Sequence, residues 1–233
     1  MSLGAAALMV ATAAVLAANE HPPRADRPSG QPTACPASAD GVVSSGNRGE
    51  REVAITFDDG PSDETRDFLG ALERRGAPAT FFVVGREIPG REDVLREAVA
   101  AGHEIANHST SHMPLPSGDD LAETSELIER ATGRAPCAFR PPEGRYSDRL
   151  LADARRLGMS VVTWDVDPED WLSQDPAGIR ERALAAVQPG SIVLMHDGGG
   201  DRTGTERSLS ALIDALRARD YELVTVSELL RNR

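Results

Sequence analysis

The chain has 233 residues, of which 25 are Lys or Arg and 37 are Asp or Glu, so its formal net charge at pH 7 is −12. This acidic balance argues against a nucleic-acid-binding protein and against an electrostatic anchor on anionic lipid, because both need a basic surface. Hydrophobic residues make up 40% of the chain and charged residues 27%, which is typical of a globular protein.

An uncharged, Ala-rich apolar stretch occupies residues 3–18. It is shorter than a membrane span and fits the apolar core of a signal peptide, although no Lys or Arg precedes it. We therefore predict a signal peptide or N-terminal apolar segment over 1–18 and no stable membrane span after processing. Residues 19–51 are rich in Pro, Gly and Ser, which predicts a linker, and the folded domain is expected over 52–233.

Short apolar runs alternate with longer helical patterns through the predicted domain. The predicted strands cover 53–57, 79–84, 103–106, 138–140, 160–164, 191–195 and 222–226. The predicted helices cover 64–75, 91–101, 119–131, 147–157, 176–187 and 207–219. This alternation predicts a parallel α/β architecture, and the pattern alone fits both a barrel and an open doubly wound sheet.

Two adjacent acids, Asp58 and Asp59, follow the first predicted strand. Charged groups at the end of a buried strand are costly unless something compensates them. One acid could simply cap the helix that follows, but this interpretation leaves the other without a role. We therefore predict two roles, one as a metal ligand and one as a proton acceptor.

Two histidines, His108 and His112, follow the third predicted strand at a spacing of four residues. At this spacing both imidazoles can converge on one ion. With Asp59 they would form a set of two imidazoles and one carboxylate, which is typical of a catalytic metal site with an open position. The same set occurs in non-haem iron oxygenases, although those usually place the carboxylate close to one His in sequence.

Polar residues also follow the next three predicted strands. Arg140 could orient a carboxylate, or it could form an ordinary surface ion pair. Asp170 and Trp171 lie after the fifth strand, where the alternative is a polar loop with one buried Trp. His196 ends the sixth strand; alone it would be interpreted as a core residue, but beside the other residues it is a candidate general acid.

Five segments at these strand ends, 56–60, 108–112, 140–144, 167–171 and 194–196, together resemble a known family. They resemble, in the same order, the motifs of polysaccharide deacetylases with a NodB homology domain, carbohydrate esterase family 4. The resemblance extends from about residue 52 to residue 230. It implies an α/β fold that is a distorted, incomplete (β/α) barrel of about seven parallel strands, with the site at the C-terminal strand ends.

The resemblance also implies roles for individual residues. The ligands of a divalent metal, most often Zn²⁺ with Co²⁺ or Ni²⁺ as alternatives, would be Asp59, His108 and His112. Asp58 would be the general base, and Arg140 would hold it in position. His196 would be the general acid, with Asp170 as its orienting partner. The substrate and oxyanion pocket would include Pro142, Glu143 and Trp171.

Glu143 departs from the family pattern, in which an aromatic residue usually stands before the glycine of the third motif. Catalysis is unaffected if only the backbone N–H of this residue acts. If its side chain contacts the sugar, the carboxylate could favour amino or cationic groups on neighbouring sugars.

The resemblance implies a metal-dependent hydrolase that removes acetyl groups from N-acetylglucosamine residues of a chitooligosaccharide or of peptidoglycan. The alternatives are an acetylxylan esterase of the same family, a non-catalytic sugar-binding relative, and a metal hydrolase or oxygenase that acts on a small molecule. We expect an acetylated carbohydrate as substrate, no nucleic-acid partner, a monomer, and a secreted or cell-wall-associated protein.

The chain has two cysteines, Cys35 and Cys137. If the chain is exported they are the only intramolecular pair that can form a disulfide. Otherwise they are two unpaired, small apolar residues.

Overall fold

The computed structural model describes residues 35–36 and 41–231. The predicted apolar segment 1–18 and most of the predicted linker therefore lie outside the described residues. None of the helices in the described part has the length and apolar character needed to cross a bilayer.

The strands form one curled parallel sheet in the order β1-β6-β5-β4-β3-β2-β7, and β8 pairs with the beginning of β2. The strands are β1 Val42–Val43, β2 Glu52–Asp58, β3 Thr80–Val83, β4 Glu104–Asn107, β5 Ala138–Phe139, β6 Ser160–Val162, β7 Ser191–His196 and β8 Glu222–Leu223. No ladder of the described residues closes the sheet between β7 and the β1–β6 edge, where isolated bridges pair Ser45 with Ser191 and Val166 with Val193. The predicted distorted and incomplete barrel is therefore confirmed, and the open doubly wound sheet is not formed.

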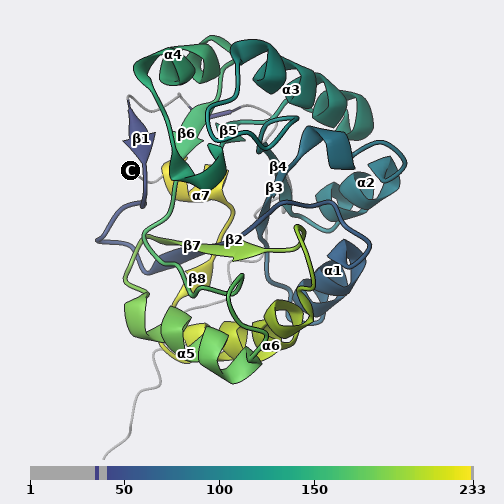
Figure 1. The fold of residues 1–233 in the computed structure, drawn as a ribbon. Coiled ribbons are helices and arrows are strands. Elements are labelled where there is room, and N and C mark those ends of the chain that lie inside the picture. The colour runs from purple at the N-terminus through teal and green to yellow at the C-terminus, as the bar shows by residue number, and fades with distance from the viewer. Residues whose placement is uncertain (1–34, 37–40, 232–233) are drawn as a thin grey trace, which may run out of the picture.

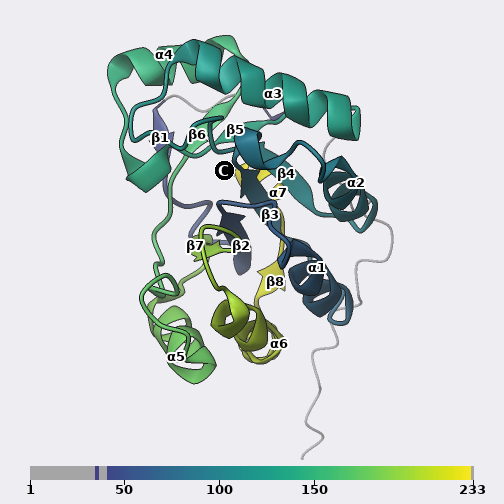
Figure 2. The ribbon, with the colours of Figure 1, turned by 45° about the vertical axis from the view of Figure 1, so that its right-hand side comes forward.

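Helices surround the strands on the outside, as Figures 1 and 2 show. They are α1 Thr65–Glu73, α2 Glu92–Ala100, α3 Gly118–Thr132, α4 Asp148–Arg156, α5 Pro176–Ala186 and α6 Thr203–Arg217. The last helix, α7 Val226–Arg231, lies inside this ring, among the strands. Two short 3₁₀ turns, η1 Gly85–Glu87 and η2 Pro142–Gly144, follow β3 and β5.

The alternation of side chains along the strands separates two apolar layers. On β2, Val53, Ile55 and Phe57 point outward and pack with residues of the surrounding helices. Ala54 points inward and packs with small and apolar residues of the other strands and of α7. By the same alternation, Asp58 at the end of β2 points into the barrel, which explains why a charged side chain there is buried.

Two elements differ from the prediction. β1 lies within the expected linker, because two apolar residues are too few to produce a strand pattern, and pairing with β6 supplies the stability. The strand expected over 222–226 ends at Leu223, and α7 begins at Val226 instead. Thr225 and Glu228 cap this helix reciprocally: Glu228 Oε2 accepts the Thr225 N–H at 2.9 Å, and Thr225 Oγ1 accepts the Glu228 N–H at 3.3 Å.

A disulfide joins Cys35 to Cys137, which directly precedes β5. This bond links the beginning of the described chain to the strand that leads to Arg140.

Candidate active site

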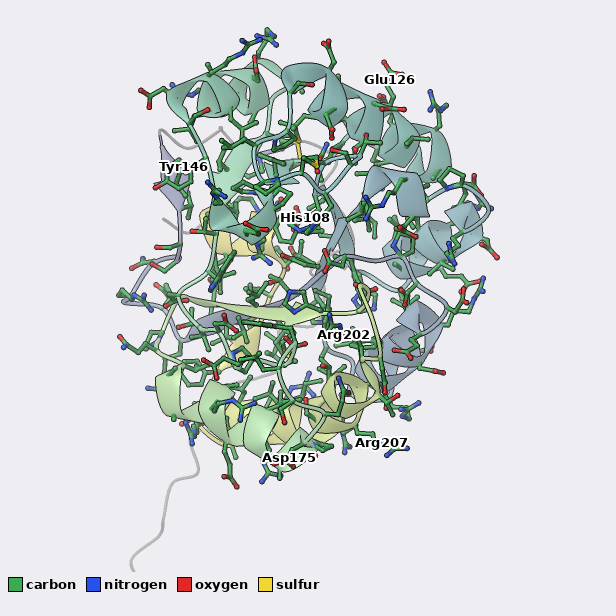
Figure 3. All side chains as sticks on the ribbon, viewed as in Figure 1. His108, Glu126, Tyr146, Asp175, Arg202 and Arg207 are labelled. Atoms are coloured by element: carbon green, nitrogen blue, oxygen red, sulfur yellow. A yellow bond between two sulfur atoms is a disulfide. The ribbon has the colours of Figure 1, made fainter. Side chains whose placement is uncertain are left out.

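The polar residues singled out in the sequence converge at the C-terminal ends of the strands. Figure 3 shows His108 near the centre of the molecule, within the ring of helices. At the C-terminal end of a parallel barrel, the loops that follow several strands can meet around one reacting group.

Asp58 and Arg140 form a fully buried ion pair in the barrel interior. Arg140 Nη1 donates to Asp58 Oδ1 at 2.6 Å and to Thr56 Oγ1 at 2.8 Å. The guanidinium lies over the Phe82 ring, 4.0 Å from its centroid, and Nη2 donates to the Thr163 carbonyl. Burial lowers the pKa of Arg140, and the negative charge of Asp58 opposes this shift. The pair therefore leaves Asp58 with one engaged oxygen, Oδ1.

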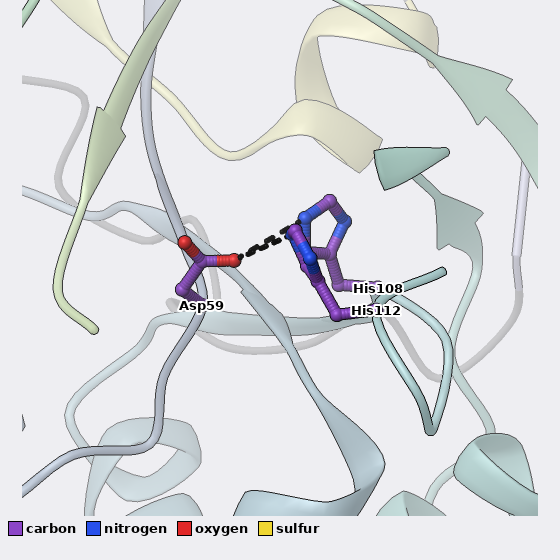
Figure 4. Close-up of side chains that lie close together, drawn as sticks. All are labelled: Asp59, His108 and His112. Atoms are coloured by element: carbon purple, nitrogen blue, oxygen red, sulfur yellow. Dashed lines mark ion pairs between the residues drawn. The ribbon is translucent and has the colours of Figure 1, made fainter. Parts of the chain in front are cut away.

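Asp59, His108 and His112 form a compact group of possible metal ligands, drawn in Figure 4. Asp59 Oδ1 lies 3.0 Å from His112 Nε2 and 3.6 Å from His108 Nε2. One ligand atom of each residue lies within 4.8 Å of the other two. Asp59 has a left-handed backbone, with φ of 74°, so its carboxylate turns toward the histidines and away from the path of β2.

The protonation of this group fits a metal. His108 Nδ1 lies 2.7 Å from the Arg140 carbonyl oxygen, which only accepts, so a proton on Nδ1 leaves the Nε2 lone pair directed at Asp59. Burial lowers the pKa of His108, which favours this neutral form. The close Asp59 carboxylate raises the pKa of His112. Burial alone would raise the pKa of Asp59, but the two imidazoles hold it below its usual value.

Asp59 Oδ1 is buried and, although His112 Nε2 lies 3.0 Å away, accepts no hydrogen bond of regular geometry from the described residues. A buried carboxylate oxygen in that state is costly unless a cation compensates it. Two imidazoles and a carboxylate are suitable ligands for a divalent ion, and they leave coordination positions open. The residues therefore fit the metal that the sequence predicts.

His196 and Asp170 form a second ion pair beside this group. Asp170 Oδ1 lies 2.8 Å from His196 Nδ1, and Asp170 Oδ2 accepts the His196 N–H at 2.9 Å. Thr205 Oγ1, from α6, donates to the same Oδ2 at 2.8 Å, so it fixes the carboxylate. Burial alone would lower the pKa of His196, but the hydrogen bond and the charge of Asp170 outweigh it and raise the pKa above its usual value.

The loop after β7 packs closely on Asp59. A side chain at Gly198 would collide with the Asp59 main-chain oxygen, and one at Gly199 would meet Asp59 Oδ2. Asp197, to which sequence reasoning gave no role, is buried between His196 and this loop. Burial raises its pKa to about 7, and Thr65 Oγ1 donates to its Oδ2 at 2.6 Å.

The residues predicted for the substrate pocket differ in their exposure to solvent. Pro142 is buried, whereas Glu143 is exposed and has a left-handed φ of 56° in η2. Trp171 is 52% exposed and is not the buried tryptophan of the alternative interpretation. A different tryptophan, Trp164, packs against Gly144 and lies 5.7 Å from the Arg140 guanidinium. Trp164 lies two residues after Val162 in a predicted strand, so the two side chains point to the same face. This alternation is the sequence signal that could have predicted Trp164 inside the barrel.

A groove of about 530 Å³ opens from Asp59 and His112. Its walls come from the loop after β2, from η1 and from the loop after β7, and they include Pro61, Asp63, Arg86, Glu87, Arg91 and Gly200. The groove therefore provides space for a polar ligand directly beside the possible metal ligands.

Residues 45–162 match the family model described as polysaccharide deacetylase. A chitooligosaccharide deacetylase of Bradyrhizobium is 38% identical over 200 residues, which cover 78% of this chain and 91% of that protein. A peptidoglycan-N-acetylglucosamine deacetylase of Bacillus cereus is 34% identical over 190 residues, which cover 78% of this chain and 89% of that protein. The chain belongs to the polysaccharide deacetylase family. The resemblance seen in the sequence is thereby confirmed.

This family also contains a protein that is described as a pseudoenzyme. Its crystal structure, from Bacillus anthracis, superposes with a TM-score of 0.77 at 28% identity and covers 83% of this chain and 70% of that one. Membership of the family therefore does not by itself establish activity. In this deacetylase-family chain, both ion pairs and the Asp-His-His group lie at the same strand ends.

Proposed function

We propose that the chain is a metal-dependent deacetylase that hydrolyses the N-acetyl amide of N-acetylglucosamine residues in chitooligosaccharides or peptidoglycan. The named activities of its relatives in Bradyrhizobium and Bacillus cereus support this substrate class. Asp59, His108 and His112 would hold the metal, with Zn²⁺ as the first choice for such ligands. When bound, the ion would supply Lewis-acid activation of a water molecule and of the acetyl carbonyl.

The observation that carries the proposal is the register of β2 and β7. Asp58 and His196 are direct partners on these neighbouring strands, so their side chains extend from one face into the same space. The partner of opposite charge engages only one of the two polar side-chain atoms in each case, Oδ1 of Asp58 and Nδ1 of His196. This arrangement supports a base and an acid that act on opposite sides of one scissile bond.

In the proposed reaction, Asp58 accepts a proton from the attacking water at Oδ2, since Oδ1 is engaged by Arg140. His196 donates a proton from Nε2 to the departing amine, since Nδ1 is engaged by Asp170. The water oxygen forms the new bond to the acetyl carbon, the C–N bond breaks, and acetate and a glucosamine amine are released.

Glu143 would contribute through its backbone. The turn hydrogen bonds of η2 run from the N–H groups of Gly144 and Arg145 to Pro141 and Pro142. The Glu143 N–H takes no part in them, and it is therefore a candidate donor to the oxygen of the acetyl carbonyl. Trp171 would line the substrate pocket at the side of Asp170.

The proposal includes secretion or association with the cell wall. Peptidoglycan is a cell-wall polymer, and the Cys35–Cys137 disulfide is compatible with an oxidising compartment.

The test is acetate release from chitopentaose, peptidoglycan and acetylxylan by metal-reconstituted protein, with Asp58→Asn as the inactive control. We expect acetate from the N-acetylglucosamine substrates and almost none from the control. Release from acetylxylan alone would favour the esterase alternative. Binding of the sugars by folded, metal-loaded protein without release of acetate would identify a non-catalytic relative.

A further inference from the structure

The loop that carries both histidines has an unfavourable backbone. Ser109 and His112 have left-handed φ values of 67° and 55°, a region that non-glycine residues rarely adopt. Such a conformation persists only when the surrounding structure enforces it. The precise placement of His108 and His112 therefore depends on what holds this loop.

Hydrogen bonds of the Asn107 and Ser109 side chains hold the ends of the loop. Asn107 Oδ1 accepts the Ser109 N–H at 2.8 Å, and Asn107 Nδ2 donates to the Leu121 carbonyl at 2.8 Å. Ser109 Oγ in turn accepts the His112 N–H at 3.1 Å. These contacts leave the middle of the loop, Thr110 and Ser111, to be held from elsewhere.

Two elements hold this middle part. Arg86 of η1 binds its carbonyl groups, because the Arg86 N–H donates to the Thr110 carbonyl at 3.3 Å and Arg86 Nη1 donates to the Ser111 carbonyl at 2.7 Å. The carboxylate of Asp120, in the first turn of α3, binds its hydrogen-bond donors. Asp120 Oδ1 accepts the Thr110 N–H at 2.5 Å and the Ser111 N–H at 3.3 Å. Its Oδ2 accepts the Ser111 hydroxyl at 2.5 Å. The Thr110 hydroxyl also donates to the Asp120 main-chain oxygen at 2.9 Å. The carboxylate of Asp120 thus accepts hydrogen bonds from three donors: the Thr110 N–H, the Ser111 N–H and the Ser111 hydroxyl.

We propose that Asp120 is a positioning residue of the metal site: it sets the geometry of His108 and His112 through the backbone between them, without binding the metal. The inference rests on the proposed function, because that function assigns the metal to these histidines. Asp120 bonds to the loop and does not belong to the Asp59, His108 and His112 group. Partners that orient metal ligands commonly affect metal affinity strongly when they are removed.

Asp119 provides a matched control. It lies in the same first turn of α3 and carries the same charge, so it makes a comparable interaction with the helix dipole. It is exposed, and of these two aspartates it is Asp120 whose carboxylate accepts hydrogen bonds from Thr110 and Ser111. A comparison of the two positions therefore separates the loop contacts from a general effect of negative charge on the helix.

The experiment uses the full chain and measures the dissociation constant for Zn²⁺ by competition with a chromophoric chelator. We expect Asp120→Ala to weaken binding by about 10- to 100-fold, and Asp119→Ala to leave it unchanged. Asp120→Asn keeps the Oδ1 acceptor and should recover part of the affinity. The visible spectrum of bound Co²⁺ should change in Asp120→Ala and stay unchanged in Asp119→Ala, a difference that a purely structural role would not produce.

Thermal unfolding of the metal-free proteins shows whether Asp120→Ala still folds. If it does not, Ser111→Ala removes only the bond to Oδ2 and should cause a smaller loss of Zn²⁺ affinity in the same direction. Wild-type affinity and an unchanged Co²⁺ spectrum in both Asp120→Ala and Ser111→Ala would overturn the inference alone. Failure of the unaltered chain to bind Zn²⁺ would overturn the proposed function as well.

Discussion

Buried carboxylates lie at both ends of the barrel, and they differ in how their oxygens are bonded. At the N-terminal end, Glu104 begins β4, and Ser227 donates to it from its N–H at 2.9 Å and from its hydroxyl. Thr80 Oγ1 adds a third bond at 3.1 Å. At the C-terminal end, Asp59 Oδ1 faces the histidines and accepts no hydrogen bond of regular geometry from the described residues.

This difference separates a structural acid from the proposed metal ligand. Both carboxylate oxygens of Glu104 accept hydrogen bonds from residues of β3 or α7. The side chain therefore fixes α7 at the N-terminal end of the barrel. The unsatisfied oxygen of Asp59 stays available for a cation. The comparison therefore predicts that substitutions at the C-terminal end change chemistry and metal binding, whereas substitutions at the N-terminal end change the free energy of unfolding.

The largest effect should come from the adjacent aspartates. Asp58→Asn keeps a hydrogen bond to Arg140 possible but cannot accept the proton of water, so acetate release should fall by about 10²- to 10⁴-fold with metal content unchanged. Asp59→Ala removes one of the possible ligands, so metal content should fall and excess metal should restore part of the activity. Metal stoichiometry measured beside acetate release checks both; loss of metal in Asp58→Asn and retention in Asp59→Ala would reverse the roles.

His196→Ala should have the next largest effect, again on turnover. Loss of the proposed proton donor should slow amide hydrolysis by about 10²- to 10⁴-fold. Acetate esters with good leaving groups need less protonation and should be affected less. Metal content should not change. Near-normal turnover of an amide substrate by the variant would remove His196 from the reaction.

The pH profile sharpens the same assignment. Because Asp170 raises the pKa of His196 above its usual value near 6.5, the acid form persists to higher pH. The fall of kcat/KM on the alkaline side should therefore lie above pH 6.5, and Asp170→Asn should move it to lower pH.

Glu104→Ala should affect stability and not chemistry. The substitution leaves the Ser227 N–H and two hydroxyls without their buried acceptor, which costs about 3 kcal/mol or more of the free energy of unfolding. Glu104→Gln keeps the shape and one acceptor and should cost less. Urea unfolding of the metal-free chain measures the loss, and Zn²⁺ affinity of the folded variant should match that of the unaltered chain. A large drop in affinity would contradict the division between the two ends.

The same division shows what sequence patterns could predict. Short apolar runs located β2, β3, β4, β5, β6 and β7, and strand-end spacing located Asp59, His108 and His112, because both signals are local. The positions of Thr205 behind Asp170 and of Asp120 behind the histidine loop depend on how helices pack on the sheet. No local pattern encodes such contacts.

Helix α7 is a different case, because a local signal was present. The apolar run after Glu222 is typical of a strand, and it led to the prediction of a strand over 222–226. Thr225 and Glu228 instead form a capping pair, which indicates a helix. The inward side of the barrel is lined by small residues such as Ala54, Ala106 and Ala138, which leaves room for a short helix with Val226 and Leu229. Tertiary space, together with the cap, therefore decides between strand and helix here.

The smallest effect should be a pH dependence from His103, beside Glu104 at the N-terminal end. His103 is buried, its Nδ1 accepts the Ala79 N–H at 3.1 Å, and burial lowers its pKa to about 4. Between pH 6.5 and pH 4 the unfolded chain therefore binds more protons than the folded one, and the free energy of unfolding falls as the pH falls.

The shift from 6.5 to about 4 corresponds to at most about 3 kcal/mol, lost progressively below pH 6.5. Glu104 acts in the opposite direction, because burial raises its pKa and the folded chain then holds a proton that the unfolded chain releases.

The test is urea unfolding of the metal-free, unaltered chain and of the His103→Gln variant, each at pH 7 and pH 5. The glutamine keeps an acceptor for the Ala79 N–H but does not titrate. The variant should lose less stability between the two pH values than the unaltered chain. Equal losses would show that His103 is already protonated, or already solvated, in the folded protein, and that the N-terminal end is less tightly closed than its hydrogen bonds indicate.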